Sequence, residues 1–157
     1  LKEGPFEALI LAYAGVVRMG YDDMIVHTFP DDEFVPAAGQ GSVAVECARN
    51  LDPELKQLIK DAVDHADTHV CLLAERAFLR TMEGGCSIPS FALAKLTADG
   101  NIRIQGGIVS LDGQQHLSEV FEGNKEEAEA LGTRLAETIL RQGGDKILKQ
   151  IRSEREE

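Results

Sequence analysis

Apolar residues in the first part of the chain predict pieces of an α/β arrangement. Residues 6–14 (FEALILAYA) form a nearly continuous apolar run, which is typical of a strand buried on both faces of a sheet. Residues 16–20 predict a helical turn beyond that strand, and residues 42–47 (SVAVEC) predict a second strand. Between the strands, residues 35–41 have the proline and glycine content of a hinge or tight loop.

Two helices are predicted next. Asp52 followed by proline is a favoured helix start, and the first helix is expected to run to about residue 65. The second is expected to begin near Asp67 and to end at Gly84-Gly85, because glycine readily adopts the left-handed conformation that closes a helix. One apolar stripe marks each helix: Leu55, Leu58, Ile59, Ala62 and Val63 on the first, and Val70, Leu73, Ala74, Ala77 and Phe78 on the second.

Three strands follow, separated by the hairpin dipeptides Asp99-Gly100 and Asp112-Gly113. They are expected over residues 91–97, 102–111 and 115–121. Asn124 then caps a helix that Gly143-Gly144 ends, and a short last helix is expected after it. The pattern predicts a compact α+β domain from about residue 61 onward, with helices packed on one face of a three-stranded antiparallel sheet.

Composition narrows the classes of function. The net charge is −11, from 16 Lys plus Arg against 27 Asp plus Glu, and this repels phosphate backbones, so no nucleic acid partner is expected. Because no apolar run approaches the roughly 20 residues that span a bilayer, and no secretory signal opens the chain, we expect a cytoplasmic protein without membrane insertion. The chain begins at Leu1 without Met, and we expect it to be a fragment of a longer protein.

The three cysteines are Cys47, Cys71 and Cys86, and no two of them share the C-x-x-C spacing of a zinc site. We therefore expect neither a metal site nor a disulfide framework. Cys47 and Cys71 lie in periodic segments and are predicted to be small buried hydrophobes. Cys86 lies in the turn Gly-Gly-Cys-Ser-Ile-Pro, where glycines leave a side chain uncovered, so an exposed thiol is predicted there.

Local chemistry does not activate Cys86. The residue follows a helix C-terminus, whose partial negative charge disfavours a thiolate, and this argues against a peroxidase or a protease. No histidine is near Cys86 in the sequence, and we expect surface or capping roles for all four: His27, His65, His69 and His116.

Three segments resemble one family. Residues 74–89 (AERAFLRTMEGGCSIP) resemble the cofactor-attachment region of the porphobilinogen deaminase family, also called hydroxymethylbilane synthases. Residues 11–20 (LAYAGVVRMG) and 36–42 (PAAGQGS) resemble the same family in the same order. Members condense four molecules of porphobilinogen into the linear tetrapyrrole hydroxymethylbilane with loss of ammonia. Their primer is a dipyrromethane cofactor held as a thioether by a cysteine, and the resemblance implies that Cys86 is that cysteine.

The resemblance also implies roles for three other residues. Arg18 lies in the turn beyond the carboxyl end of the first predicted strand, where open α/β sheets place their ligands. It matches a family arginine that pairs with the acetate and propionate groups of the pyrroles, a task that suits a bidentate guanidinium. Gln40 and Gly41 match the hinge loop that lines the cofactor cleft. The family has three domains, of which the first two are α/β domains like those of periplasmic binding proteins. By this comparison, residues 1–34 end the second domain, 35–60 return to the first, and 61–157 form the complete third domain.

The same comparison leaves the N-terminal part of the enzyme outside this chain, together with its catalytic aspartate and most of its arginine-rich cleft. The fragment is therefore expected to contain no catalytic residue and to be inactive alone. An unpaired apolar run such as residues 6–14 is expected to promote self-association or to leave that segment disordered. Two alternatives remain. One is a non-catalytic binding module derived from the same third domain, which uses its α+β surface for protein association. The other is a redox-active thiol protein oxidised at Cys86, against which the helix end argues.

Overall fold

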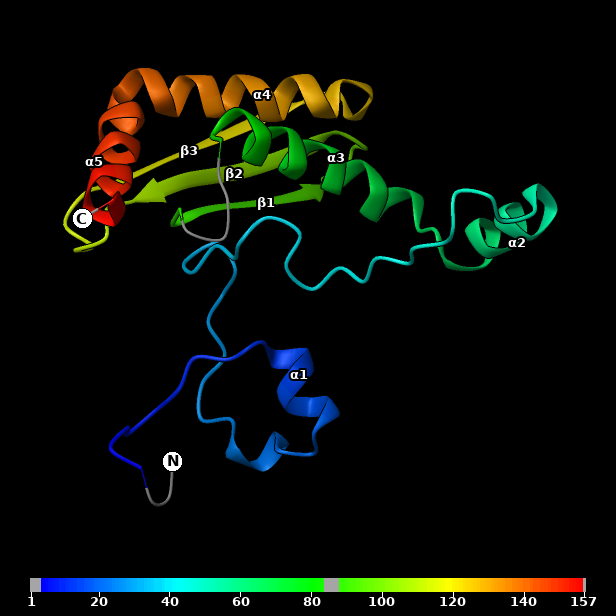
Figure 1. Cartoon of the computed structure of the whole chain (residues 1–157), viewed down its shortest axis with the longest axis horizontal. Helices are drawn as coiled ribbons and strands as arrows, with labels where there is room; N and C mark the ends of the chain where they lie inside the picture. The colour runs from blue at the N-terminus through cyan, green and yellow to red at the C-terminus, as the bar shows by residue number, and fades with distance from the viewer. Residues whose placement is uncertain (1–3, 84–87, 157) are drawn as a thin grey trace. The chain divides into compact units, whose positions relative to one another are not determined.

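The computed structural model describes residues 4–83 and 88–156 and divides into two compact units, Leu1–Phe34 and Val35–Glu157 (Figure 1). The first unit contains the helix α1, Tyr13–Arg18, and the short 3-10 helix η1, Asp22–Met24. The predicted helical turn is thus confirmed, although it begins three residues earlier than expected. No described helix in either unit is long and apolar enough to cross a membrane.

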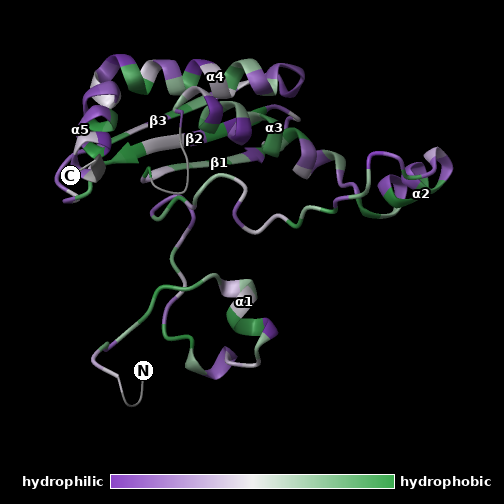
Figure 2. Cartoon of the chain, viewed as in Figure 1, coloured by the Kyte–Doolittle hydropathy of each residue, from purple (hydrophilic) through white to green (hydrophobic). Residues whose placement is uncertain are grey.

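Both strands predicted in the first 50 residues are wrong. Residues 6–12 and 42–47 form neither helix nor strand, and apolar side chains in both are largely exposed, among them Ile10 at 66% and Val43 at 84%. The physical reason is that a strand must pair its backbone N–H and C=O groups with a neighbour. Within the described residues, pairing partners exist only inside the C-terminal sheet. Figure 2 shows the apolar residues that run along the first unit.

The C-terminal sheet has the predicted form. The strands β1 (Ser90–Leu96), β2 (Ile102–Val109) and β3 (His116–Gly123) are antiparallel and lie in the order β1-β2-β3. Gly100 and Gly113 occupy the two hairpin turns with φ angles of 83° and 71°, a left-handed conformation that glycine adopts without steric cost. The two Asp-Gly dipeptides therefore predicted the positions of both hairpin turns correctly.

Two helices cover one face of this sheet (Figure 1). The helix α3, Ala66–Thr81, packs on β1, and α4, Ala128–Ile139, packs on β2 and β3 and against α3. Their contact is close because Gly132 has no side chain: a Cβ there would lie 2.0 Å from the Ala74 carbonyl oxygen. The core between helices and sheet includes Ala74, Phe78, Met82, Ala92, Ala94, Ile102, Ile104, Ile108, Leu131, Leu135, Ala136 and Ile139. The α+β prediction is confirmed.

Short helices flank these elements. Asn124 caps the 3-10 helix η2, Lys125–Glu127, as predicted, by accepting a hydrogen bond from the Glu126 N–H. After α4, a π-helical segment η3 (Leu140–Gly144) leads into α5 (Asp145–Glu156), and Gly143 has a φ angle of 118° at the kink. Ile147 and Ile151 of α5 are buried in the core. The last helix thus closes one end of the domain.

The helix α2 (Pro53–Val63) is capped as predicted, because the Asp52 carboxylate accepts hydrogen bonds from the Glu54 and Leu55 N–H groups. Its apolar stripe remains uncovered, with Leu58 at 65% and Val63 at 55% exposure. An amphipathic helix is stabilised mainly by packing of its apolar face. The described chain provides no such packing for these two side chains.

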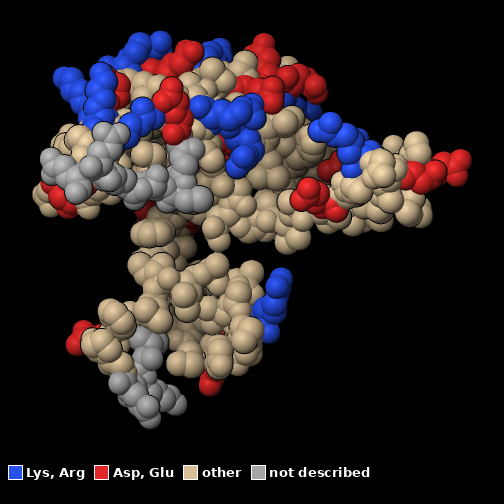
Figure 3. All heavy atoms as spheres, viewed as in Figure 1, with Lys and Arg blue, Asp and Glu red and all other residues tan. Residues whose placement is uncertain are grey.

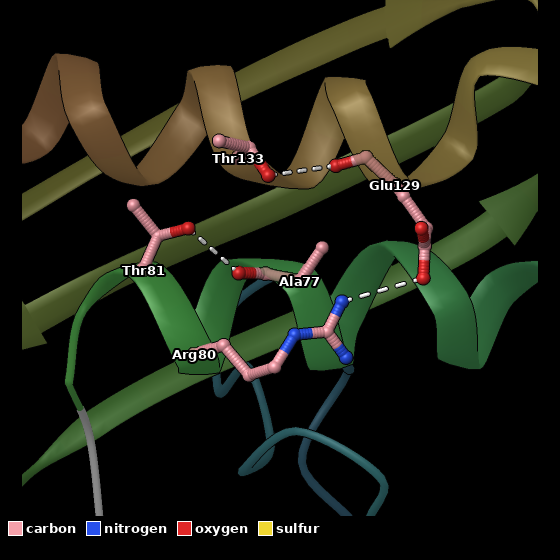
Figure 4. A network of polar contacts seen from close by, with 5 residues as sticks. All are labelled: Ala77, Arg80, Thr81, Glu129 and Thr133. Atoms are coloured by element: carbon pink, nitrogen blue, oxygen red, sulfur yellow. Dashed lines mark hydrogen bonds and ion pairs between the residues drawn. The ribbon is translucent and has the colours of Figure 1, made fainter.

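The last turn of α3 is tied to α4 (Figure 4). The Arg80 guanidinium lies 3.3 Å from a Glu129 carboxylate oxygen, and the Thr81 hydroxyl donates to the Ala77 carbonyl at 2.9 Å. On α4, the Thr133 hydroxyl donates to the Glu129 carbonyl at 3.0 Å. Both partners of the ion pair are exposed, so it adds less than about 1 kcal/mol. Burial of the apolar side chains is what fixes α3.

Candidate functional site

Cys86 lies outside the described residues, as do Gly84 and Gly85, where α3 was expected to end. The described helix ends at Thr81, and Glu83 has a left-handed φ angle of 48°. The side chains that flank this segment are held in place: Met82 is fully buried, and Ile88 packs against the core. On the surface, the Glu83 carboxylate accepts a hydrogen bond from Arg152 of α5 at 2.7 Å.

Arg18 is the last residue of α1 and is exposed. Among the described residues, its guanidinium makes neither an ion pair nor a hydrogen bond. An arginine of this kind retains its full set of five donors for a carboxylate or phosphate ligand. The structure is therefore compatible with the carboxylate-binding role implied for Arg18, which stays a prediction.

Gln40 and Gly41 lie in a double turn that we call the 36–42 loop. The Gln40 N–H donates to the Ala37 carbonyl at 3.0 Å, and the Ser42 N–H donates to the Gly39 carbonyl at 3.2 Å. Gly39 and Gly41 have φ angles of 78° and 83°, and a Cβ at Gly41 would meet no atom within 4 Å. The backbone at Gly41 is thus open to a ligand.

Glu75 is a buried carboxylate beside the 36–42 loop that the sequence did not predict. It lies on α3 and is 4% exposed. Its Oε1 accepts a hydrogen bond from the Ala94 N–H of β1 at 2.8 Å, and its Oε2 accepts one from the Gly39 N–H of the 36–42 loop at 2.7 Å. Burial raises the pKa of the Glu75 carboxyl above its ordinary value, and the two backbone hydrogen bonds oppose part of that rise.

A cavity of about 290 Å³ lies beside this carboxylate, between the 36–42 loop, α3 and β1. It is lined by Gln40, Ser42, Asp67, Thr68, Cys71, Leu72, Glu75, Leu93, Ala94, Lys95 and Leu96. Burial and then the charge of Glu75 raise the pKa of the Cys71 thiol, which disfavours the reactive thiolate. Cys71 packs against the core but is only half-buried, so the prediction of a small buried hydrophobe is confirmed in part.

The prediction for Cys47 is wrong, because the residue is exposed. Its burial depended on the strand predicted for residues 42–47, and that strand does not form. The surface or capping roles expected for the histidines are confirmed: all four are exposed, and His65 caps α3 by accepting a hydrogen bond from the Thr68 N–H. Within residues 4–83 and 88–156, no three His, Cys, Asp or Glu side chains gather as metal ligands would.

The structure describes Arg18 in the first unit and Gln40 and Gly41 in the second. Within the second unit, the hydrogen bond from the Gly39 N–H to Glu75 joins the turn that contains Gln40 and Gly41 to α3. A signal for Glu75 was present in the sequence, since it follows Cys71 by four residues on the inward side of a helix. A lone carboxylate at such a position is ordinarily solvated, which is why the pattern alone did not reveal it.

Comparison with known proteins identifies two domains of one family. Residues 1–57 match the model described as porphobilinogen deaminase, dipyromethane cofactor binding domain. Residues 69–141 match the model described as porphobilinogen deaminase, C-terminal domain. Arg18, Gln40 and Gly41 lie in the first match and Cys86 in the second. The two matches together take in all four residues predicted to hold the cofactor.

Curated relatives give the same result. The porphobilinogen deaminase of Desulfosudis oleivorans is 47% identical over 154 residues, which cover 98% of this chain and 49% of the relative. That of Cytophaga hutchinsonii is 47% identical over 152 residues, covering 97% and 48%. That of Carboxydothermus hydrogenoformans is 41% identical over 157 residues, covering 100% and 50%.

The chain thus spans about half the length of the curated relatives it matches. The two family models match in succession, and the relatives match over nearly all of its residues. The family resemblance of the three short segments is confirmed on this wider basis: the chain belongs to the porphobilinogen deaminase family.

Proposed function

We propose that the chain is the C-terminal part of a porphobilinogen deaminase, and that it holds the dipyrromethane cofactor on Cys86 while four molecules of porphobilinogen are condensed into hydroxymethylbilane. The observation that carries this proposal is the match of residues 1–57 to the family's cofactor binding domain, followed by the match of residues 69–141 to its C-terminal domain. When bound, the dipyrromethane supplies the pyrrole end to which the chain of new pyrroles is added.

The described residues fit a ligand of this kind. Its carboxylates suit the Arg18 guanidinium, which is exposed and has no partner among the described residues. The open backbone at Gly41 suits the close approach of a planar ring. The Cys86 thiol would provide the covalent bond as the nucleophile, and it needs no lowered pKa, because the pyrrole that it attacks is a strong electrophile once ammonia has left.

The domain assignment is part of the proposal: residues 1–34 end the second domain, 35–60 return to the first, and 61–157 form the third. The division of the chain between residues 34 and 35 supports its first boundary. The catalytic aspartate and most of the cationic cleft then belong to the part of the relatives that this chain does not span. The family assignment in turn supports a cytoplasmic enzyme of tetrapyrrole and heme biosynthesis.

The partner that fits the exposed apolar residues is the remaining half of the same protein. Large apolar side chains of the first 63 residues are more than half exposed, and they include Phe6, Leu9, Ile10, Leu11, Tyr13, Met19, Tyr21, Val26, Phe34, Val43, Val45, Leu58 and Val63. On the face seen in Figure 3, residues that are neither acidic nor basic dominate the first unit. Because such surface is costly in water, we infer that it packs against the rest of the enzyme, and that the chain self-associates when alone.

The test compares porphobilinogen turnover by this chain with turnover by the complete protein. We expect the complete protein to form hydroxymethylbilane and this chain alone to form none. In the complete protein, Cys86→Ser should abolish turnover, and Cys47→Ser, which removes an exposed thiol outside the site, should leave it unchanged. Turnover by the chain alone would show that catalysis does not need the other half, and full activity of Cys86→Ser would refute the role of Cys86.

A further inference from the structure

Glu75 joins three separate elements through its two carboxylate oxygens. It lies on α3, one oxygen accepts from Ala94 of β1, and the other accepts from Gly39 of the 36–42 loop. The side chain is almost fully buried. A carboxylate is rarely buried unless hydrogen bonds replace the water it loses, so both contacts are needed for Glu75 to occupy this position.

The contact with Ala94 provides a hydrogen-bond partner for a backbone N–H at the edge of the sheet. β1 is an edge strand, and its N–H groups at Ala92 and Ala94 bond outside the sheet. The Pro36 carbonyl accepts from Ala92 at 3.2 Å, and Glu75 accepts from Ala94. The 36–42 loop is therefore attached at two points, directly through Pro36 and indirectly through the carboxylate that holds Gly39.

The arrangement requires a carboxylate and not merely a polar side chain. Each oxygen faces a different N–H donor, and an ionised carboxylate offers two acceptor oxygens and no donor. A glutamine would turn its own N–H₂ group toward one of the two donors. Glutamine can therefore satisfy the Ala94 N–H or the Gly39 N–H, but not both.

The helix α3 supports the 36–42 loop through Glu75, whose other oxygen is held by β1. We propose that Glu75 is a positioning residue that anchors the Gln40–Gly41 turn to α3 and β1 and so fixes where that turn presents its backbone to the cofactor. This role rests on the proposed function, but the anchor itself can be measured without it.

The anchor is tested by amide hydrogen exchange in the 157-residue chain. Glu75→Gln should speed exchange of the Gly39 or the Ala94 amide at least about tenfold, because one hydrogen bond to a charged acceptor is lost. The Ile104 amide, in the middle of the sheet, should keep its rate. The control Glu129→Gln removes an exposed carboxylate from α4 and should change neither amide. Unchanged exchange at both Gly39 and Ala94 in Glu75→Gln overturns the proposal.

If Glu75→Gln loosens the whole domain, a pH titration of the unmodified chain followed by NMR tests the anchor instead of amide exchange. The amide resonance of Gly39 should titrate with the same midpoint as the Glu75 carboxyl carbon, because the two groups are bonded. Asp67, Cys71 and Lys95 also line the neighbouring cavity, so the carboxyl carbon of Glu75 must be followed itself. A Gly39 amide resonance that does not shift as the Glu75 carboxyl titrates overturns the anchor.

The positioning role is tested in the complete protein. Glu75→Gln should lower kcat by about tenfold to a hundredfold through misplacement of the turn, while Cys86 still carries its two-pyrrole adduct and Glu129→Gln keeps the normal kcat. An unchanged kcat with a released Gly39 amide overturns the positioning role and leaves the proposed function intact. Absence of both adduct and turnover in the unmodified protein refutes the proposed function instead, and the exchange results still decide the anchor.

Discussion

Gly132 is the position at which a single methyl group should most directly disturb the packing of α3. A Cβ at Gly132 would lie 2.0 Å from the Ala74 carbonyl oxygen and 3.1 Å from the Phe78 nitrogen, whereas real Cβ contacts essentially never fall below 3.0 Å. Both neighbours are backbone atoms of α3, which cannot rotate away as a side chain can. In Gly132→Ala, α3 and α4 must therefore separate by about 1 Å.

The cost follows from two opposing effects. Overpacking of a well-filled core costs about 3 kcal/mol at the upper end of its usual range, and a backbone clash between helices belongs there. Alanine in place of glycine within a helix contributes about 1 kcal/mol in the opposite direction. The free energy of unfolding should therefore fall by about 2 kcal/mol in Gly132→Ala.

Urea unfolding followed by circular dichroism measures this change. The control is Arg134→Ala, two residues along the same helix at an exposed position, which should alter the free energy of unfolding by less than about 0.5 kcal/mol. A Gly132→Ala chain as stable as the unmodified one would refute the close approach of α3 to α4.

Three further predictions concern titration, thiols and association. Because burial raises the pKa of Glu75 in the folded chain, ionising this carboxyl costs more free energy in the folded than in the unfolded chain, so the stability difference from a neutral residue should be largest below about pH 4.3 and decrease as pH rises through the folded pKa. The unfolding free energy of the unmodified chain minus that of Glu75→Gln should therefore fall between pH 4 and 8, and a rise would contradict the shift. In a Cys86→Ser background, a thiol-alkylating reagent should modify exposed Cys47 at least about tenfold faster than Cys71, whose pKa is raised by burial and by Glu75. Mass spectrometry of the two peptides measures both rates, and equal rates would show that the Cys71 thiol is accessible to the reagent. Sedimentation of the chain alone should give a mass above the 17.1 kDa of one copy. The double substitution Leu58→Glu and Val63→Glu, which places charge on the exposed stripe of α2, should lower that mass. A monodisperse monomer in the unmodified chain would contradict self-association.

Local signals in the sequence were sufficient for the C-terminal domain. The two Asp-Gly dipeptides mark hairpins whose glycines have positive φ angles, and Asp52 and Asn124 cap helices with their own side chains. Each of these features depends on contacts within a few residues. They survive in any context that keeps the backbone folded, and this explains their agreement with the structure.

Signals that depend on distant partners did not predict the structure. The apolar runs at residues 6–14 and 42–47 indicate burial, but a strand forms only where another strand completes its hydrogen bonds. Cys47 was misjudged for the same reason. Glu75 was missed because its role comes from N–H groups of Ala94 and Gly39, which lie 19 and 36 residues away in the sequence.

For the candidate site too, the local structure around the residues could be predicted from the sequence, whereas their roles could not. Helix and turn signals indicated the surroundings of Arg18, Gln40 and Gly41, and the structure describes a short helix and a double glycine turn there. Their roles, and that of Cys86, came from the family resemblance, because no spacing rule identifies a pyrrole ligand. Only the tertiary structure reveals the carboxylate that connects the Gly39 turn to α3.

Peptide mass spectrometry of the active complete protein tests directly whether Cys86 is bonded covalently to the dipyrromethane. The peptide containing Cys86 should carry the added mass of two pyrrole units, the peptides of Cys47 and Cys71 should be unmodified, and Cys86→Ser should have no adduct. An unmodified Cys86 in a fully active preparation, or the adduct on another residue, would show that Cys86 does not hold the cofactor.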